Sequence, residues 1–157
     1  MKPQIGIIPK NLGKSIVLLS SVLADEMTLY IKTRKSHWNV TGESFMELHK
    51  LFEHQYTLLE ASIDEIAERI GKLGEKAIGT MQEFLSLTSI KERPGKYTST
   101  KETITELLSD HEIIIKHLRL GIEESTNKNK DVGTADFLTG LLEQHETIAW
   151  TLRRYLQ

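Results

Sequence analysis

The chain has 157 residues, close to the usual size of one domain, and hydrophobic residues make up 39% of it against 27% charged residues. This composition indicates a globular domain, and because no apolar run approaches the ~20 residues of a membrane span, we expect no association with a membrane. The absence of cysteine excludes disulfides, thiolate metal sites and a cysteine nucleophile, so any metal site must use histidine and carboxylate side chains. The formal net charge of −2 gives the chain no overall attraction to nucleic acid.

The N-terminal residues do not have the pattern of a secretory signal. Residues 1–14 carry Lys2, Lys10 and Lys14 but no continuous apolar stretch followed by small residues. We therefore expect a cytoplasmic protein that forms a single domain over residues 1–157, with residues 1–11 as a flexible N-terminal tail.

Two periodic segments predict the first two long helices. In the first segment, a stripe recurs every seven residues: Ile16, Leu23, Tyr30 and His37. This spacing marks the buried face of a helix, which we expect from about Leu12 to Val40. In the second segment, the stripe consists of Phe45, Phe52, Leu59 and Ile66. The second helix should end at Gly71 and Gly74, because glycine is common just past a helix C-terminus.

The rest of the chain predicts a crossover and two more helices. Residues 75–100 hold one small apolar cluster followed by a polar stretch, so we expect a long crossover that contains one short helix. Thr100 can cap a third helix, which runs through Ile122 and ends before the polar loop of residues 125–131. A fourth helix is expected from about Thr134 to Tyr155. No segment has the pattern of a strand, and the predicted fold class is all-α, a four-helix bundle with one long crossover.

The second helix carries the residues that could bind a metal ion. Bundles that hold two metals within one subunit use Glu-x-x-His pairs, and none of the six histidines has a glutamate three residues before it. Instead, His49 with Glu53 and Asp64 with Glu68 are spaced i, i+4, so each pair shares one helix face. Glu53 and Asp64 lie roughly 16 Å apart along a helix axis, too far for one metal ion. Each pair is therefore half of a site.

The two halves can join if the second helix lies antiparallel against its copy in another subunit. Positions 49 and 68, and positions 53 and 64, are both centred between residues 58 and 59, so one two-fold axis serves both pairs. An isologous dimer would then have two identical sites, each with one pair from either chain. His37, in line with the buried stripe of the first helix, can add a second imidazole. Two imidazoles and three carboxylates suit ferrous iron.

These residues also have interpretations without a metal. Carboxylates at i, i+4 are common on solvated helix faces, and this interpretation is favoured for Asp64 and Glu68 taken alone. A histidine on an apolar stripe is more often a hydrogen-bonded interior residue than a ligand. For His37 and His49, the matching carboxylates favour metal binding.

Three other residues receive separate predictions. We predict that His111 and His145, which have no matching carboxylates, are hydrogen-bonded interior residues. We expect Trp38 to pack at the subunit interface, and a redox role beside the iron site stays open as an alternative.

Four stretches of the chain resemble the Dps proteins (DNA protection during starvation), a branch of the ferritin-like superfamily. Lys35–Glu53, KSHWNVTGESFMELHKLFE, resembles the His-Trp-Asn motif of the family and the Leu-His and acidic positions after it. Asp64–Arg69 is similar to the second acidic motif, and Asp131–Leu138 and His145–Trp150 resemble the last helix. The resemblance covers nearly the whole chain and implies a ferritin-like four-helix bundle. It places the intersubunit ferroxidase ligands of the family on His37, His49, Glu53, Asp64 and Glu68.

The resemblance also implies an assembly and an activity. The assembly is a hollow homododecamer with iron sites at isologous two-fold contacts. The activity is that of a ferroxidase, an oxidoreductase that oxidises Fe(II) at di-iron sites, preferably with hydrogen peroxide. The ferric product is stored as a mineral inside the shell, which protects the cell from oxidative damage. Many members have Asp where this chain has Glu53, and the longer side chain can alter iron spacing or occupancy.

Similar proteins admit iron through acidic pores at the three-fold axes, near the start of the last helix. Asp131 and Asp136 lie in this region and are candidate pore residues. Each of them also fits a structural role, in ending the preceding loop or in complementing the positive end of the helix dipole.

DNA binding, which the family name suggests, has weak support in this chain. Lys2, Lys10 and Lys14 are the only basic residues near the N-terminus, and the acidic net charge opposes DNA binding. Repetition over twelve subunits can still amplify the attraction of a few lysines for DNA. Two alternatives stay open. A non-enzymatic DNA-compacting shell would retain DNA after loss of the iron ligands. A passive site for zinc or another divalent metal would bind metal without consuming peroxide.

Overall fold

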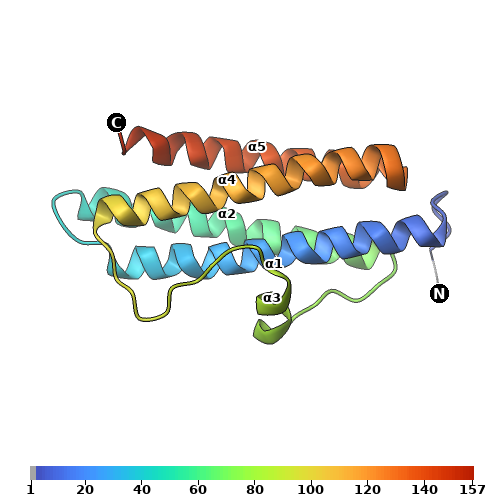
Figure 1. The fold of residues 1–157 in the computed structure, drawn as a ribbon, viewed down its shortest axis with the longest axis horizontal. Helices are drawn as coiled ribbons and strands as arrows, with labels where there is room; N and C mark the ends of the chain where they lie inside the picture. Colours follow the sequence, from blue (N-terminus) through green and yellow to red (C-terminus); the bar gives the residue numbers. More distant parts are fainter. Residues whose placement is uncertain (1–2) are drawn as a thin grey trace.

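The computed structural model describes residues 3–157, and within them it contains helices and no strand. The elements in chain order are α1 (Pro9–Asn39), α2 (Phe45–Lys72), α3 (Met81–Leu87), α4 (Thr100–Glu124), η1 (Ser125–Asn129) and α5 (Val132–Arg154). The four long helices lie side by side as a bundle (Figure 1). The prediction of an all-α four-helix bundle, with a long crossover that contains one short helix, is confirmed. Across residues 3–157, no helix is both long and apolar enough to cross a membrane.

The long crossover is needed because α2 and α4 run in the same direction. The chain runs along α1, returns along α2, crosses over α1 with α3 packed beside it, runs along α4 and returns along α5 (Figure 1). The antiparallel neighbours α1 and α2 need only the short turn of residues 40–44 between them. Gly42 has a φ of +102° in this turn, a backbone conformation that side-chain-bearing residues rarely adopt.

The predicted stripes form much of the core of the bundle, but Phe45, which begins the second stripe, is exposed. Leu23 of α1 and Phe52, Leu59 and Ile66 of α2 are almost completely shielded from solvent. The other two helices contribute Ile114, Leu118, Leu138 and Leu152 to the same core. Each large apolar side chain buried in this way contributes about 1.5–3 kcal/mol. The core therefore fixes how α1 and α2 lie against each other.

Several predicted helix boundaries were wrong by a few residues. The first helix begins at Pro9, three residues before Leu12, because proline is well tolerated in the first turn, where its missing N–H is not needed. Residues 9–11 of the predicted tail are thus helical, and Lys2 lies outside the described residues. Ser99, and not Thr100, caps α4, since its hydroxyl accepts from the backbone N–H of Glu102 and the Glu102 side chain accepts from Ser99 N–H.

The predicted loop of residues 125–131 is also largely helical. Residues Ser125–Asn129 continue α4 as a short π-helix, and the side chains of Ser125 and Asn129 are buried despite their polarity. The helix ends at Lys130, which has a φ of +57°. Asp131 then caps α5, which begins at Val132, two residues before the predicted start.

Candidate metal centre

His37 near the end of α1 and His49 near the start of α2 lie against each other. Their rings are stacked, with centroids 3.7 Å apart and 20° between the planes. The Nδ1 atom of His37 lies 2.8 Å from the carbonyl oxygen of His49, and the Nδ1 atom of His49 lies 2.9 Å from the carbonyl oxygen of His37. Because a carbonyl oxygen can only accept, each Nδ1 must carry a proton and donate it.

This reciprocal pair of hydrogen bonds leaves both Nε2 atoms available. In the neutral ring, a proton on Nδ1 means that the lone pair lies on Nε2, which is the form that binds a metal ion. The hydrogen bond at Nδ1 also fixes the orientation of each ring, as partners outside the metal shell do for ligating histidines. His37 is buried and His49 is half-buried, so the two rings already have most of their freedom removed.

The register of α1 against α2 explains why these residues meet. In an antiparallel pair, moving seven residues back along one helix corresponds to moving seven forward along the other. The same register that brings His37 to His49 brings Tyr30 to Tyr56, whose ring centroids are 6.1 Å apart. The Tyr56 ring also meets the His37 ring edge-on at 5.2 Å. The aromatic stripe thus supports the imidazole pair from one side.

Arg34 is a residue of this region that the sequence patterns did not single out. Its guanidinium group donates a 2.7 Å hydrogen bond to the hydroxyl of Tyr30. Its carbon Cζ lies 4.5 Å from the ring centroid of Tyr56 and 5.4 Å from that of Trp38, distances typical of cation–π contacts. The position of Arg34, one helical turn before His37 and Trp38, was the only signal for this role. Trp38 itself is 63% exposed in the single chain.

The three predicted carboxylate ligands lie on the outer face of α2. Glu53, Asp64 and Glu68 are all exposed, and Glu68 forms an ion pair with Lys72 at 3.1 Å. Within residues 3–157 of one chain, no group of three or more histidine, aspartate or glutamate side chains is placed to hold a metal ion. One chain therefore brings together His37 and His49, but it does not bring Glu53, Asp64 or Glu68 to them.

The two candidate pore residues occupy different environments. Asp131 is 1% exposed; its carboxylate accepts from Thr134 N–H at 3.0 Å and pairs with Arg69 at 3.1 Å. Burial raises the pKa of Asp131, but the hydrogen bonds from Thr134 and the charge of Arg69 together contribute to lowering it, and the pKa lies below the ordinary value. Asp136, by contrast, is exposed on the first turns of α5.

The prediction that His111 and His145 are hydrogen-bonded interior residues is confirmed. Both are completely buried; their Nδ1 atoms lie 2.8 Å apart, and His145 Nε2 lies 2.6 Å from a carboxylate oxygen of Glu26. Glu26 and His111 bind opposite nitrogens of the His145 ring, so the three cannot surround a single metal ion. They form a hydrogen-bonded chain across the core, from α1 through α5 to α4.

The arrangement on α1 and α2 of one chain supplies only some of the ligands that a divalent metal ion needs. Two oriented imidazole nitrogens form an incomplete ligand set, and the exposed carboxylate of Glu53, one turn beyond His49, is not gathered with them into a metal-binding group within residues 3–157 of one chain. The second pair, Asp64 with Glu68, is an equally incomplete set further along the same face of α2. Both sets can be reached from outside the chain.

Comparisons with known proteins identify the family and the fold of the chain. A family model for the ferritin-like domain matches residues 16–157. A low temperature-induced protein of Nostoc is 44% identical over 153 residues, which cover 98% of this chain and 86% of the relative. The DNA protection during starvation protein 2 of Bacillus anthracis is 38% identical over 142 residues, which cover 90% of this chain and 95% of the relative.

The structure also superposes on solved structures. The Dps protein of Vibrio cholerae, described as a member of a broad superfamily of ferritin-like diiron-carboxylate proteins, matches with a TM-score of 0.92 and 29% sequence identity. That match covers 100% of this chain and 98% of the other. The similarity therefore extends over the whole bundle, including α1 and α2, which carry the paired histidines.

Proposed function

Because this chain belongs to the Dps family of ferritin-like proteins, a family associated with iron storage and DNA protection, we propose that it is a ferroxidase that oxidises Fe(II), preferably with hydrogen peroxide, and stores the ferric product. The observation that carries the proposal is the pair His37 and His49. Two imidazoles that hold each other by Nδ1 and leave both Nε2 atoms free are arranged for metal binding rather than for packing alone.

The complete iron site forms between two subunits. His37, His49 and Glu53 come from one chain, and Asp64 and Glu68 come from its two-fold partner. The exposure of all three carboxylates in the single chain supports this arrangement, because they remain accessible to a second copy. The exposed indole of Trp38 supports it as well, since a large apolar surface of this kind is suited to an interface.

The paired irons explain the protective effect. Two ferrous ions held side by side give one electron each to a single hydrogen peroxide, and with two protons the products are two ferric ions and two water molecules. A lone ferrous ion supplies only one electron, so it releases hydroxyl radical. The carboxylates stabilise the increased charge of the ferric product, and the imidazoles bind iron in both oxidation states.

Storage follows from the assembly. We propose a hollow shell of twelve copies, in which the ferric product is deposited as a mineral. Asp136 supplies an exposed carboxylate near a three-fold pore, and Asp131 contributes to the same region by holding the start of α5 in place. Oxidation and sequestration of iron are then two stages of one protective process.

The first test is the amount of hydrogen peroxide consumed per ferrous ion in the metal-free protein under anaerobic conditions. The expected value is about one peroxide for two irons, with little trapped hydroxyl radical and with the fast phase lost in His49→Ala. Glu123→Gln, an exposed carboxylate near the end of α4 and away from the proposed site, serves as the control. Oxidation no faster than in buffer would leave a passive metal site, and the DNA-compacting alternative would then be preferred.

A second test addresses the shared site. His49→Ala and Asp64→Ala should each be nearly inactive, whereas assemblies made from a mixture of the two chains should recover activity. Recovery is expected because a mixed dimer keeps one intact site, with the histidine half from one chain and the acidic half from the other. If the mixture is no more active than either variant alone, the ligands do not come from two subunits.

A further inference from the structure

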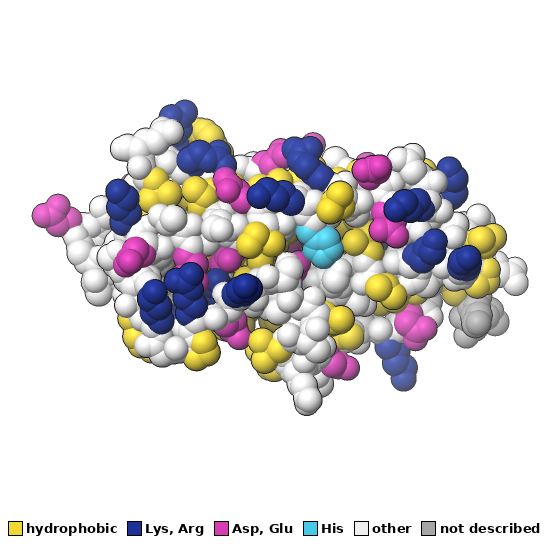
Figure 2. Space-filling model, in the orientation of Figure 1, with side chains coloured by type: hydrophobic (Ala, Val, Ile, Leu, Met, Phe, Trp, Pro, Cys, Tyr) yellow, Lys and Arg dark blue, Asp and Glu magenta, His cyan; other side chains and the backbone are white. Residues whose placement is uncertain are grey.

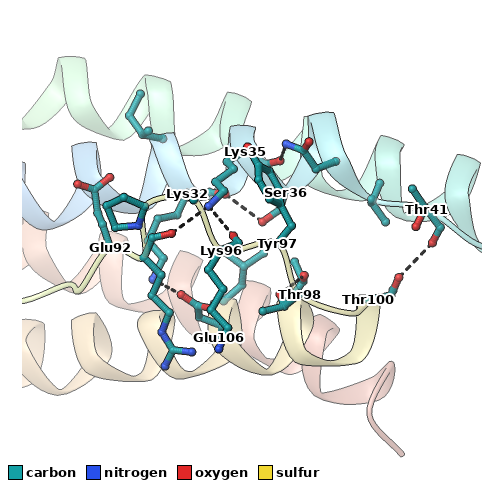
Figure 3. A pocket seen from close by; sticks show the side chains of 18 residues that line it. Lys32, Lys35, Ser36, Thr41, Glu92, Lys96, Tyr97, Thr98, Thr100 and Glu106 are labelled. Atoms are coloured by element: carbon teal, nitrogen blue, oxygen red, sulfur yellow. Dashed lines mark hydrogen bonds and ion pairs between the residues drawn. The ribbon is translucent and has the colours of Figure 1, made fainter.

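A cavity of about 340 Å³ lies between the end of α1, the crossover at residues 92–98 and the start of α4 (Figure 3). Lys35, which lines it, is two positions before His37, and two positions correspond to roughly 200° around a helix. The cavity therefore opens on the side of α1 away from the paired histidines. Its volume falls at the lower end of the range for small-molecule sites, about 300–1,000 Å³.

Two lysines of α1 hold the crossover in the position that creates the cavity. Lys32 Nζ donates to the carbonyl of Lys91 at 2.8 Å. Lys35 Nζ donates to the carbonyls of Arg93 at 3.2 Å and Lys96 at 2.8 Å (Figure 3). The crossover is thus tied to α1 at three backbone carbonyls. The walls of the cavity are formed before any ligand arrives, which lowers the entropic cost of binding.

The cationic groups of the cavity are only partly neutralised. Lys32 is paired with Glu106 and Asp110, so its charge is compensated. For Arg93 and Lys96, no side-chain ion pair or hydrogen bond to a carboxylate is present within residues 3–157. Lys and Arg side chains, with acidic ones beside them, also gather on the surface over this part of the crossover (Figure 2).

Arg93 and Lys96 line two adjoining compartments. The first compartment, the cavity just described, has apolar walls from Ile31, Val40, Pro94, Tyr97 and Leu107. The second compartment shares Arg93 and Lys96, adds Lys91 and Lys101, and is also lined by three carboxylates, those of Glu102, Glu106 and Asp110. Basic side chains outnumber acidic ones in both compartments, so an anionic group is favoured beside Arg93 and Lys96, and an apolar group can lie next to it in the first compartment.

From this arrangement we infer that the chain has a binding site for a small phosphate ester of about the size of a nucleoside monophosphate. The phosphate lies between Arg93 and Lys96, where charge-assisted hydrogen bonds from both side chains recognise it. The aromatic or apolar body lies in the first compartment, where the 71% exposed ring of Tyr97 is available to stack against it. Glu92, on the same rim, disfavours ligands with further negative charges.

The test is isothermal titration calorimetry of the assembled, iron-free protein with AMP, adenosine, inorganic phosphate and a single-stranded oligothymidylate. AMP should bind at least tenfold more tightly than adenosine or phosphate, because only AMP occupies both compartments. Arg93→Gln with Lys96→Gln should weaken AMP at least tenfold, and Tyr97→Ala should weaken AMP but not phosphate. Lys116→Gln, which removes an exposed charge elsewhere on α4, is the matched control and should leave AMP binding unchanged.

The proposal is overturned by three results. These are no detectable AMP binding at millimolar concentration, equal AMP affinity in the Arg93/Lys96 double variant, and binding of the oligothymidylate without binding of AMP. The last result would show that the cations form a surface for polyanions and not a site for a small ester. The titration uses no iron, so its outcome is independent of the proposed ferroxidase activity.

Discussion

The hydrogen-bonded chain from Glu26 through His145 to His111 places three ionisable residues in an apolar core. His111 occupies its far end, with no hydrogen-bond partner for its Nε2 atom within residues 3–157. Burial lowers the pKa of His111 well below its ordinary value, and the neighbouring His145 lowers it further. The buried side chains of α2, among them Gln55 and Ser62, include no titratable group that could offset a charge on His111.

This environment makes the stability of the protein sensitive to acid. An unfolded His111 takes up a proton near pH 6.5, whereas the folded one does not, so the unfolded state binds more protons below that pH. The stabilisation is complete above about pH 6.5 and is lost as the pH falls towards the lowered pKa. His111→Asn keeps a hydrogen-bonding group near the position of Nδ1 but cannot be protonated. Between pH 7.5 and 5, the free energy of unfolding of this variant should therefore fall by about 1–2 kcal/mol less than that of the parent protein.

The measurement is urea unfolding at a series of pH values. His54→Asn, at an exposed position of α2, controls for loss of a histidine in general and should follow the parent protein. Identical pH profiles for the parent and His111→Asn would show that another group is responsible for the acid sensitivity.

Variants of Asp131 and Asp136 should have different effects, because Asp131 stabilises the fold whereas Asp136 is proposed to act in iron entry. Asp131→Ala removes the cap of α5 and the ion pair with Arg69, so it should lower the free energy of unfolding by about 1–3 kcal/mol. Asp136→Asn changes only an exposed charge, so it should shift stability by less than about 0.5 kcal/mol while slowing iron uptake. Thermal unfolding and stopped-flow iron uptake test the two effects, and an unchanged uptake rate in Asp136→Asn would remove Asp136 from the pore.

At the scale of elements, Asp25 of α1 anchors the crossover to the bundle. Its carboxylate accepts hydrogen bonds from the backbone of Ser89 at 2.6 Å, from the hydroxyl of Thr88 at 2.9 Å and from His117 Nδ1 at 2.9 Å. Burial raises the pKa of Asp25, but these donors lower it by more, so the carboxylate stays ionised. One buried charge thus joins α1, the end of α3 and α4.

Loss of this anchor should loosen the crossover before it unfolds the bundle. Asp25→Ala leaves the buried donors without an acceptor, and Asp25→Asn keeps one acceptor oxygen. Trypsin should therefore cut after Lys91 and Lys96 fastest in Asp25→Ala, more slowly in Asp25→Asn and slowest in the parent protein, as followed by mass spectrometry. Glu123→Gln, an exposed carboxylate of α4, is the control. Equal cleavage rates in all four proteins would mean that the crossover is held by other contacts.

At the scale of the whole molecule, charge decides how the proposed shell meets DNA. Each chain carries a formal charge of −2, so a shell of twelve repels a polyanion except where basic side chains gather locally. We expect twelve copies of the 17.9 kDa chain by native mass spectrometry and no shift of plasmid DNA in a gel at physiological salt. A shift that persists in His49→Ala would instead support the DNA-compacting alternative.

The sequence alone determined the helices, and it predicted the ligand types. Stripes such as Phe52, Leu59 and Ile66 recur at the helical period because one face of each helix must be buried. This requirement is local, so the spacing of residues along the sequence is enough to show it. Spacing along α2 likewise paired His49 with Glu53 and Asp64 with Glu68. Boundaries were less certain, because Ser99 and Asp131 cap helices through side-chain geometry that several neighbouring residues could also provide.

Only the tertiary structure decided which groups face each other across helices. The reciprocal bonds of His37 and His49, the contact of Arg34 with Tyr56, and the chain that links His145 to His111 all depend on helix register. Register is set by the packing of the whole core, in which many side chains contribute at once, and no local pattern encodes it. The same holds for the crossover cavity, because Arg93 and Lys96 enclose it only where Lys35 holds their carbonyls against α1.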